Sequence, residues 1–308
     1  MEIDADFRAD LCELCKQLLE QSGYKVRTRV KDKLTKQLGT DPVEPYYFVI
    51  QYCNVEHRFV LPRPRAVVKH PGFVCPPGDE AGLHAFLAKV EAGGELMRHA
   101  STKIRKADYP DALFNDWHIH HFHLGTTIGK GGFAKRSENV LLAMVTREAI
   151  YCIDILPHEN VEGNAPWTKQ HLVEIVHEHW PFLIERGHLP GVLPSRETRT
   201  EQELQELREA GVLVPIYTRD GAAYVAIGGG YATSRDSTHA VRRAALYLQA
   251  AAQSEKWLRE NIEEFAESAA TAGRPLPDGP RFKLMMDETH LIAVEFTAEV
   301  NVRLVPRP

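Results

Sequence analysis

Four of the fifteen histidines fall within six consecutive positions, and this stretch constrains the fold more than any other. The stretch is Asp116-Trp-His-Ile-His-His-Phe-His-Leu-Gly125, in which Trp, Ile, Phe and Leu favour a strand. Gly125 and the further glycines at 129, 131 and 132 predict that this strand ends in a loop.

A strict two-residue alternation would mix polar and apolar side chains on both faces of this strand. We therefore expect a bulge near His120–His121, which would gather the apolar side chains on one core face. His123, with His121 or His120, would then point away from the core. Because imidazole exchanges a proton near neutral pH, the cluster predicts a functional site, although it does not name a substrate.

The length and composition suit a soluble protein of two domains. The chain has 308 residues, of which 44% are hydrophobic and 26% charged. No apolar run approaches the roughly 20 residues of a membrane span, and the acidic start Met-Glu-Ile-Asp-Ala-Asp is unlike a secretory signal. We expect a cytoplasmic protein with no membrane contact.

Five cysteines in a chain of this length do not suggest a disulfide framework. Cys12 and Cys15 form a C-x-x-C, which could begin a zinc site with two of Cys53, His57 and Cys75. They lie, however, in the apolar stripe of an expected helix, and no second C-x-x-C follows. We expect them to be core cysteines.

Charge is unevenly distributed along a chain whose net charge is -5. Residues 1–136 carry 20 basic and 17 acidic side chains, whereas residues 137–308 carry 17 basic and 25 acidic ones. Two basic segments, 24–70 and 98–136, flank or lead into the histidine strand. A local basic surface of this kind can bind phosphates, although a solvated charged face is an equal alternative.

The periodicity and turn signals predict an α+β protein. Helices are expected at residues 4–22, 79–92, 96–106, 167–180, 201–210 and 236–269. Strands are expected at residues 24–30, 46–53, 57–61, 116–124, 140–145, 149–156, 212–218, 222–227, 282–286 and 290–304. The glycines at 228–230 precede the longest helix, but their spacing matches no phosphate-binding motif, so we expect a plain capped turn.

The domain boundary is expected in the proline- and glycine-containing stretch 188–200. Residues 1–187 would form a basic-faced N-terminal region, and residues 201–308 would form a smaller α+β domain with a long helix. The central part of the N-terminal region, residues 79–182, would hold helices followed by an antiparallel sheet.

The element order in residues 79–182 resembles that of the RelE/ParE/HigB superfamily of ribonuclease toxins. The resemblance rests on Asp116-Trp-x-Ile-His-His-x-His-Leu124, on Arg136 before a strand, and on Tyr151-x-Ile-Asp-Ile-x-x-His158. It covers roughly 100 residues and includes no strict signature motif. It implies metal-independent RNA cleavage, in which a 2′-hydroxyl attacks the neighbouring phosphodiester, in a growth-arresting or defence effector.

The resemblance also implies roles for the histidines. His121 and His123 would be the general base and the general acid, in an order left open. His120 would take one of these places if the bulge fell differently. His158 would lie nearby, at the end of a pairing strand.

The basic residues would bind the RNA. Arg136, helped by Lys135, would stabilise the charge of the transition state. Lys103 and Lys106, with Lys130 in the glycine-rich loop, would hold flanking phosphates. The implied partners are RNA, free or on the ribosome, and an inhibitory protein, and no cofactor is needed.

Two other hypotheses remain open. His118-x-His120 and His121-x-His123 each place two imidazoles on one strand face, which suits zinc or iron with Asp154 or His158 as third ligand. Such a site would make the chain a metal-dependent hydrolase. Alternatively, the acidic second region would make it a non-enzymatic regulator that binds a partner protein.

Overall fold

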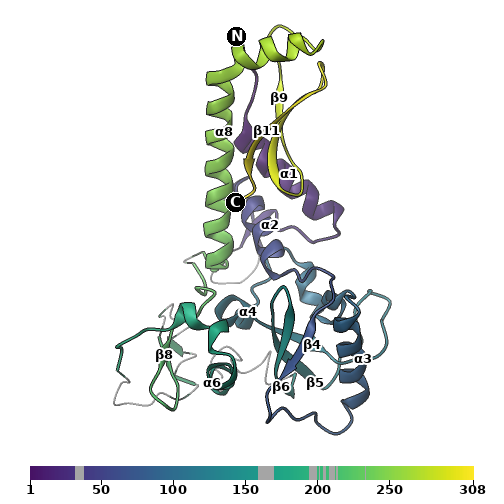
Figure 1. Ribbon diagram of the computed structural model, residues 1–308, viewed down its shortest axis with the longest axis vertical. Coiled ribbons are helices and arrows are strands. Elements are labelled where there is room, and N and C mark those ends of the chain that lie inside the picture. The colour runs from purple at the N-terminus through teal and green to yellow at the C-terminus, as the bar shows by residue number, and fades with distance from the viewer. Residues whose placement is uncertain are drawn as a thin grey trace. The chain divides into compact units, whose positions relative to one another are not determined.

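The computed structural model describes residues 1–31, 38–158, 170–193, 200, 202–203, 206–207, 212, 214–232 and 234–308. It has the expected α+β class and forms two compact units (Figure 1). Unit 1 comprises residues 1–57, 105–108 and 240–308, and unit 2 comprises residues 58–104 and 109–239. This division differs from the expected boundary at 188–200, which falls inside unit 2, because the two ends of the chain share one core.

Unit 1 packs three helices against a three-stranded antiparallel sheet of order β11-β10-β9. The helices are α1 (Phe7–Gln21), α2 (Tyr47–Arg58) and α8 (Thr238–Thr271), and the sheet strands are β9 (Phe282–Met286), β10 (His290–Glu295) and β11 (Val300–Pro306). A separate antiparallel pair joins β1 (Arg29–Lys31) and β2 (Leu38–Pro42). The long helix was expected from its pattern, and it buries Tyr247, Ala251, Ser254 and Leu258 at successive steps of four, three and four residues.

Residues 47–58 form a helix where we expected two strands. Tyr, Phe, Val and Ile in this stretch favour strands as isolated residues. Val49 and Cys53, however, lie four residues apart and are both fully buried in the core of unit 1. Packing of that helical face therefore outweighs the local preference. Cys12 and Cys15 lie in the same core, as expected, and burial raises the pKa of the Cys15 thiol.

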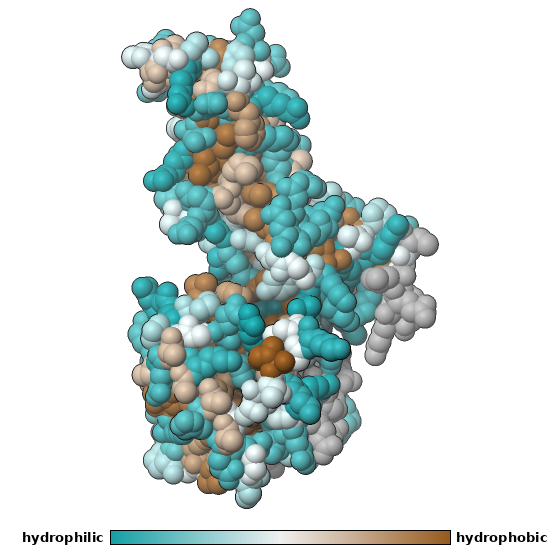
Figure 2. All heavy atoms as spheres, turned by 90° about the vertical axis from the view of Figure 1, so that its right-hand side faces the viewer, coloured by the Kyte–Doolittle hydropathy of each residue, from teal (hydrophilic) through white to brown (hydrophobic). Residues whose placement is uncertain are grey.

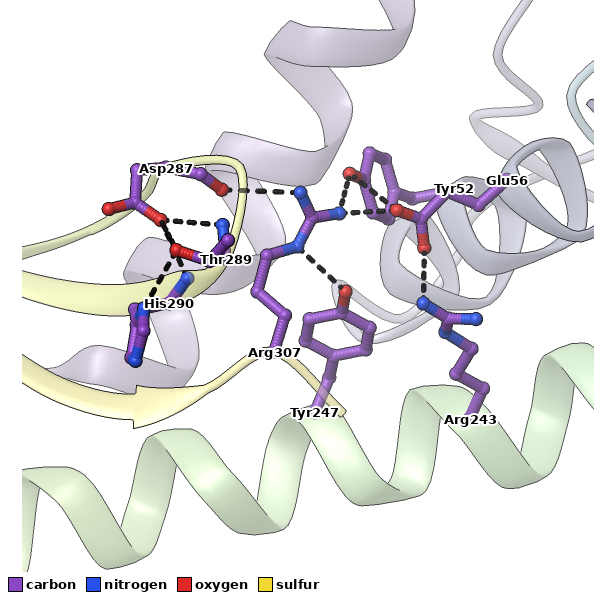
Figure 3. Close-up of polar contacts among 8 residues, drawn as sticks. All are labelled: Tyr52, Glu56, Arg243, Tyr247, Asp287, Thr289, His290 and Arg307. Carbon is purple, nitrogen blue, oxygen red and sulfur yellow. Dashed lines mark hydrogen bonds and ion pairs between the residues drawn. The ribbon is translucent and has the colours of Figure 1, made fainter. Parts of the chain in front are cut away.

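The end of the chain is tied into unit 1 by a network around Arg307 (Figure 3). The guanidinium binds the Glu56 carboxylate and donates to the hydroxyls of Tyr52 and Tyr247, at 2.7 and 3.2 Å. Arg243 forms an ion pair with the same carboxylate at 3.2 Å. The network joins α2, α8 and the end of the chain, which helps residues 1–57 and 240–308 form one unit.

Unit 2 is built on a four-stranded mixed sheet of order β3-β6-β5-β4. Its strands are β3 (Ala66–Lys69), β4 (Ile119–His123), β5 (Asn139–Val145) and β6 (Ala149–Pro157). β3 runs parallel to β6, and the other pairs are antiparallel. The helices α3 (Glu80–Glu91) and α6 (Gln170–His179) cover opposite faces of this sheet, each over its own hydrophobic cluster (Figure 1).

Several elements of unit 2 differ from the expected ones. Residues 96–106 form two short 3-10 helices, Leu96–His99 and Thr102–Arg105, instead of one α-helix. β3 lies between residues 61 and 79, where we expected no helix or strand. The strands expected at 212–218 and 222–227 are present but short, as β7 (Ile216–Tyr217) and β8 (Ala223–Tyr224), and they form a hairpin about Asp220-Gly221. The start of the helix expected at 167–180 and most of the one expected at 201–210 lie outside the described residues.

The β7–β8 hairpin is attached to α6 by a histidine. His177 Nε2 lies 2.9 Å from the Asp220 carboxylate, and its Nδ1 lies 2.8 Å from the Tyr224 hydroxyl. Because each ring nitrogen of His177 has a partner on the hairpin, this contact fixes α6 against it. Within the described residues, no helix has the length and apolar character needed to cross a membrane.

Both units expose some apolar side chains. Phe296 in unit 1 and Phe182 in unit 2 are 63% and 59% exposed. Figure 2 shows apolar residues (brown) gathered on one face of unit 1, between polar residues (teal).

Candidate functional site

The histidine strand follows a short helix, α4 (Ala112–Trp117), that was not expected. Asp111 caps this helix, because its carboxylate accepts the Phe114 N–H at 3.2 Å. His118 ends the helix in the left-handed conformation, with φ 57°. The strand therefore begins only at Ile119, and residues 116–118 are not part of it.

β4 lacks the bulge that we expected near His120–His121. Its residues pair with those of β5 in unbroken register from Ile119 to His123. A bulge is unnecessary because both faces of the sheet are buried, one under α3 and one under α6, so either face accepts apolar side chains. Regular alternation places His121 and His123 on the α6 face and His120 on the α3 face.

His121 is buried without the hydrogen bonds that such a ring normally makes. It is 6% exposed, and neither ring nitrogen has a hydrogen-bond partner among the described residues. Its Nδ1 lies 3.8 Å from the nearer carboxylate oxygen of Asp111, which is slightly beyond hydrogen-bond distance. Leaving a buried polar group unpaired costs about 1–3 kcal/mol, so this imidazole is a candidate for a role other than packing.

His123, His158 and Arg136 form a contact chain on the same face. The rings of His123 and His158 are stacked, with centroids 4.8 Å apart and planes inclined by 20°. Arg136 Nη2 donates to the His158 ring, at 2.8 Å from Nε2. Arg136 is exposed and His158 is partly buried, whereas His123 is almost fully buried. The row His121, His123, His158 and Arg136 therefore reaches solvent at its Arg136 end.

The backbone of His123 is held by a second buried histidine. His99 Nδ1 donates to the His123 carbonyl oxygen at 2.8 Å, and Lys89 Nζ lies 2.7 Å from His99 Nε2. Burial lowers the pKa of His99, so the ring stays neutral and accepts from the lysine. This contact fixes the end of β4 at the position of His123.

The other two histidines of the stretch do not join this row. His120 lies on the α3 face, with ring centroids 4.5 Å from Phe114 and 5.5 Å from Phe122. Burial lowers the pKa of His120 to about 3, so it is neutral at physiological pH. His118 lies at the end of α4, where Arg186 Nη2 donates to its Nδ1 at 2.7 Å. The alternative role of His120 depended on a bulge, and β4 has none, so His120 lies on the face opposite His121 and His123.

The expected RNA-binding lysines lie in two groups. Lys130 and Lys135 are exposed in the loop that leads to Arg136, where they can add to its positive charge. Lys106, by contrast, belongs to unit 1 and Lys103 to unit 2, so they do not form one basic surface within a unit.

The loop before Arg136 is held by close backbone packing at Gly125. A Cβ atom at this position would collide with the Lys135 carbonyl oxygen. The Lys135 N–H donates to the Thr127 carbonyl oxygen at 2.8 Å, which closes the loop on itself. Gly125 therefore helps to determine where Arg136 lies.

The described part of the chain does not provide a set of ligands for the metal-site hypothesis. No group of three or more His, Cys, Asp or Glu side chains is arranged there to hold a metal ion. Asp154, one expected third ligand, lies 3.4 Å from His171 of α6 instead.

The backbone N–H groups of the glycine-rich turn before α8 already have hydrogen-bond partners. The N–H groups of Gly228 and Gly230 donate to the carbonyl oxygens of Asp116 and Asn115, and that of Gly229 donates to Ala226. These groups are not available to an anion, so the turn is the plain one that we expected.

Sequence reasoning missed Asp111 as a neighbour of His121. The signal was present, because Pro110-Asp111 before Ala112-Leu113-Phe114 is a helix N-cap pattern. We had not considered a helix before the strand. Comparisons with protein-family models, curated proteins and solved structures give no significant match to this chain.

Proposed function

We propose that the chain is an endoribonuclease that cleaves RNA by attack of a 2′-hydroxyl on the neighbouring phosphodiester. The observation that carries the proposal is the row His121, His123, His158 and Arg136 along one face of a single sheet. Three imidazoles and a guanidinium supply the base, the acid and the cation that this reaction needs. The three consecutive antiparallel strands β4, β5 and β6 also support the resemblance to the RelE/ParE/HigB superfamily.

In the proposed reaction, His121 takes the proton of the 2′-hydroxyl. The Asp111 carboxylate lies beside this ring, with an oxygen 3.8 Å from Nδ1. The 2′-oxygen attacks phosphorus, and the bond to the 5′-oxygen of the next nucleotide breaks. The stacked pair His123–His158 returns a proton to that oxygen. The products are a 2′,3′-cyclic phosphate and a 5′-hydroxyl.

Arg136 stabilises the extra negative charge on the phosphate oxygens in the transition state. It is the exposed member of the row, so a phosphate that it binds enters the site from solvent. Exposed Lys130 and Lys135 on the same loop bind flanking phosphates, a contribution that weakens with salt. Cells would need an inhibitory partner for such an activity, as expected of a toxin or defence effector.

The test is cleavage of end-labelled RNA in EDTA, both free and bound to ribosomes, by the wild type and the double variant His121→Asn, His123→Asn. The matched control is His120→Asn, which changes the same residue type on the opposite face of the same strand. We expect the wild type and the control to cleave and the double variant to lose activity by at least about 100-fold. A 2′-deoxy substitution at the cleaved nucleotide should abolish cleavage.

Three results would overturn the proposal. The first is full activity in the double variant, and the second is cleavage of the 2′-deoxy substrate. The third is activity that EDTA removes, together with stoichiometric bound zinc or iron that is lost with the two histidines, which would identify a metal-dependent hydrolase instead.

A further inference from the structure

Unit 2 has an open pocket of about 590 Å³ that the proposed reaction does not use. It lies where β4 begins, whereas Arg136 and His158 lie at the other end of the strand. Its size is within the range of small-molecule sites. Six of the residues that line the pocket are His118, Met144, Thr146, Phe182, Glu185 and Arg186.

The walls of this pocket suit a flat, uncharged ring with polar edges. Phe182 is 59% exposed, so much of its ring is available for stacking. Glu185 and Arg186 are both exposed and carry opposite charges. A simple anion would be repelled by Glu185 and a simple cation by Arg186. A heterocycle that has both hydrogen-bond donors and acceptors can use both side chains, and a nucleobase is such a ring.

His118, in the pocket wall, has an unusual backbone conformation and a lowered side-chain pKa. Its φ of 57° is uncommon for a residue other than glycine, and such backbone positions cluster at functional sites. The Phe114 ring is stacked on the imidazole at 5.3 Å, and Arg186 donates to Nδ1 at 2.7 Å. Burial and the nearby Arg186 lower the pKa of His118 to about 3, so it adds no positive charge.

The pocket shares a wall residue with the sheet face that carries the proposed catalytic histidines. Met144 in its wall belongs to the hydrophobic cluster under α6, the face on which His121 and His123 lie. His118 and His121 are three positions apart, which is about 10 Å along an extended chain. The pocket therefore lies at the opposite end of β4 from Arg136, where the row meets solvent, and an RNA strand with one base in the pocket can extend along unit 2 to that end.

We propose that this pocket binds one unpaired base of the RNA substrate, with Phe182 as the stacking surface and Glu185 and Arg186 at the polar edge of the base. The inference rests on the proposed ribonuclease function and names a binding site for its substrate. It predicts that base recognition and cleavage use different side chains of unit 2.

The test is binding without cleavage. A short fluorescein-labelled 2′-O-methyl oligoribonucleotide, which has no 2′-hydroxyl to attack, is titrated with the full chain and followed by fluorescence anisotropy. A matched series of this probe carries one abasic site at each position in turn. The variants are Phe182→Ala and Arg186→Ala. The control is Arg147→Ala, which removes an exposed charge on the neighbouring turn outside the pocket.

We expect Phe182→Ala to weaken binding about 5- to 150-fold, the effect of losing one base stack. One abasic position should weaken binding to the wild type by a similar factor and have no further effect on Phe182→Ala. Arg186→Ala should weaken binding more than Arg147→Ala does.

The inference is overturned if the wild type binds the probe and Phe182→Ala binds it equally well, or if abasic losses and Phe182→Ala simply add. Those results leave the proposed cleavage untouched, because His121 and His123 do not line the pocket. No binding of any RNA by the wild type would instead overturn both proposals. Circular dichroism of each variant separates loss of binding from loss of fold.

Discussion

Mild acid should destabilise unit 2 through His120. Its pKa is about 3 in the folded chain and 6.5 as its ordinary value, and burial is the main cause of the shift. The unfolded chain therefore binds a proton below pH 6.5 that the folded chain does not take up until about pH 3. Stability is lost as pH falls through this window, by about 1.36 kcal/mol per pH unit.

The size of the effect at pH 5 follows from that slope. The 1.5 units between pH 6.5 and pH 5 correspond to a loss of about 2 kcal/mol for His120. His118, which is partly buried and has a pKa of about 3, contributes in the same direction. His99 adds to it, because burial lowers its pKa as well. A loss of this size is a large fraction of the roughly 5–15 kcal/mol that stabilises a typical domain.

The assay is urea unfolding at pH 7 and pH 5, followed by tryptophan fluorescence in a background with Trp167→Phe and Trp257→Phe. The remaining tryptophans, 117 and 180, both belong to unit 2, so the signal reports that unit. His120→Phe keeps an aromatic ring between Phe114 and Phe122 but cannot be protonated. We expect it to reduce the pH-dependent loss of unfolding free energy by about 2 kcal/mol.

The control is His84→Gln, which changes an exposed histidine of α3 and should leave the pH dependence unchanged. If His120→Phe and the wild type lose the same free energy between pH 7 and pH 5, the buried neutral state of His120 is not the cause. The reasoning would then be refuted.

Three further predictions concern positions elsewhere in the fold. Gly125→Ala forces the Lys135 carbonyl away and so misplaces Arg136, and we expect RNA cleavage to fall up to about 100-fold. The control is Gly131→Ala, where an added Cβ meets no atom within 4 Å, and this variant should cleave RNA normally. Phe122→Ala removes a fully buried ring under α3 and should lower the unfolding free energy, measured in urea, by about 3–5 kcal/mol. Glu56→Ala leaves Arg243 and Arg307 without their shared carboxylate and should lower the unfolding free energy of unit 1, measured by thermal unfolding, by about 1.5–3 kcal/mol. Asp4→Ala, which removes an exposed ion pair, should lower it by less than about 1 kcal/mol in the same assay.

Local patterns in the sequence predicted the elements whose residues interact mainly with near neighbours. The apolar stripes of α1, α3 and α8, the β5–β6 hairpin and the Asp220-Gly221 turn were all expected at about the observed positions. In each of these, the period of apolar residues or the turn chemistry is complete within the segment itself. The histidine strand was also expected, with its start misplaced by three residues because the N-cap signal of Asp111 was overlooked.

The tertiary structure alone decided which faces are buried and which side chains meet. α2 is a helix because one of its faces packs into the core of unit 1, which is built from residues far away in the sequence. The strand-favouring composition of this segment carries no information about that core. The covering of both faces of the unit 2 sheet removed any need for a bulge in β4, and this regular alternation separated His120 from His121 and His123.

The candidate site shows the same division. The sequence by itself determined that four histidines lie close together and that Arg136 and His158 flank the strands beside them. Only the folded chain stacked His158 on His123, placed Asp111 beside His121 and built the pocket at His118. The physical reason is that residue order specifies neighbours along the chain, whereas burial, pairing register and long-range packing specify neighbours in space.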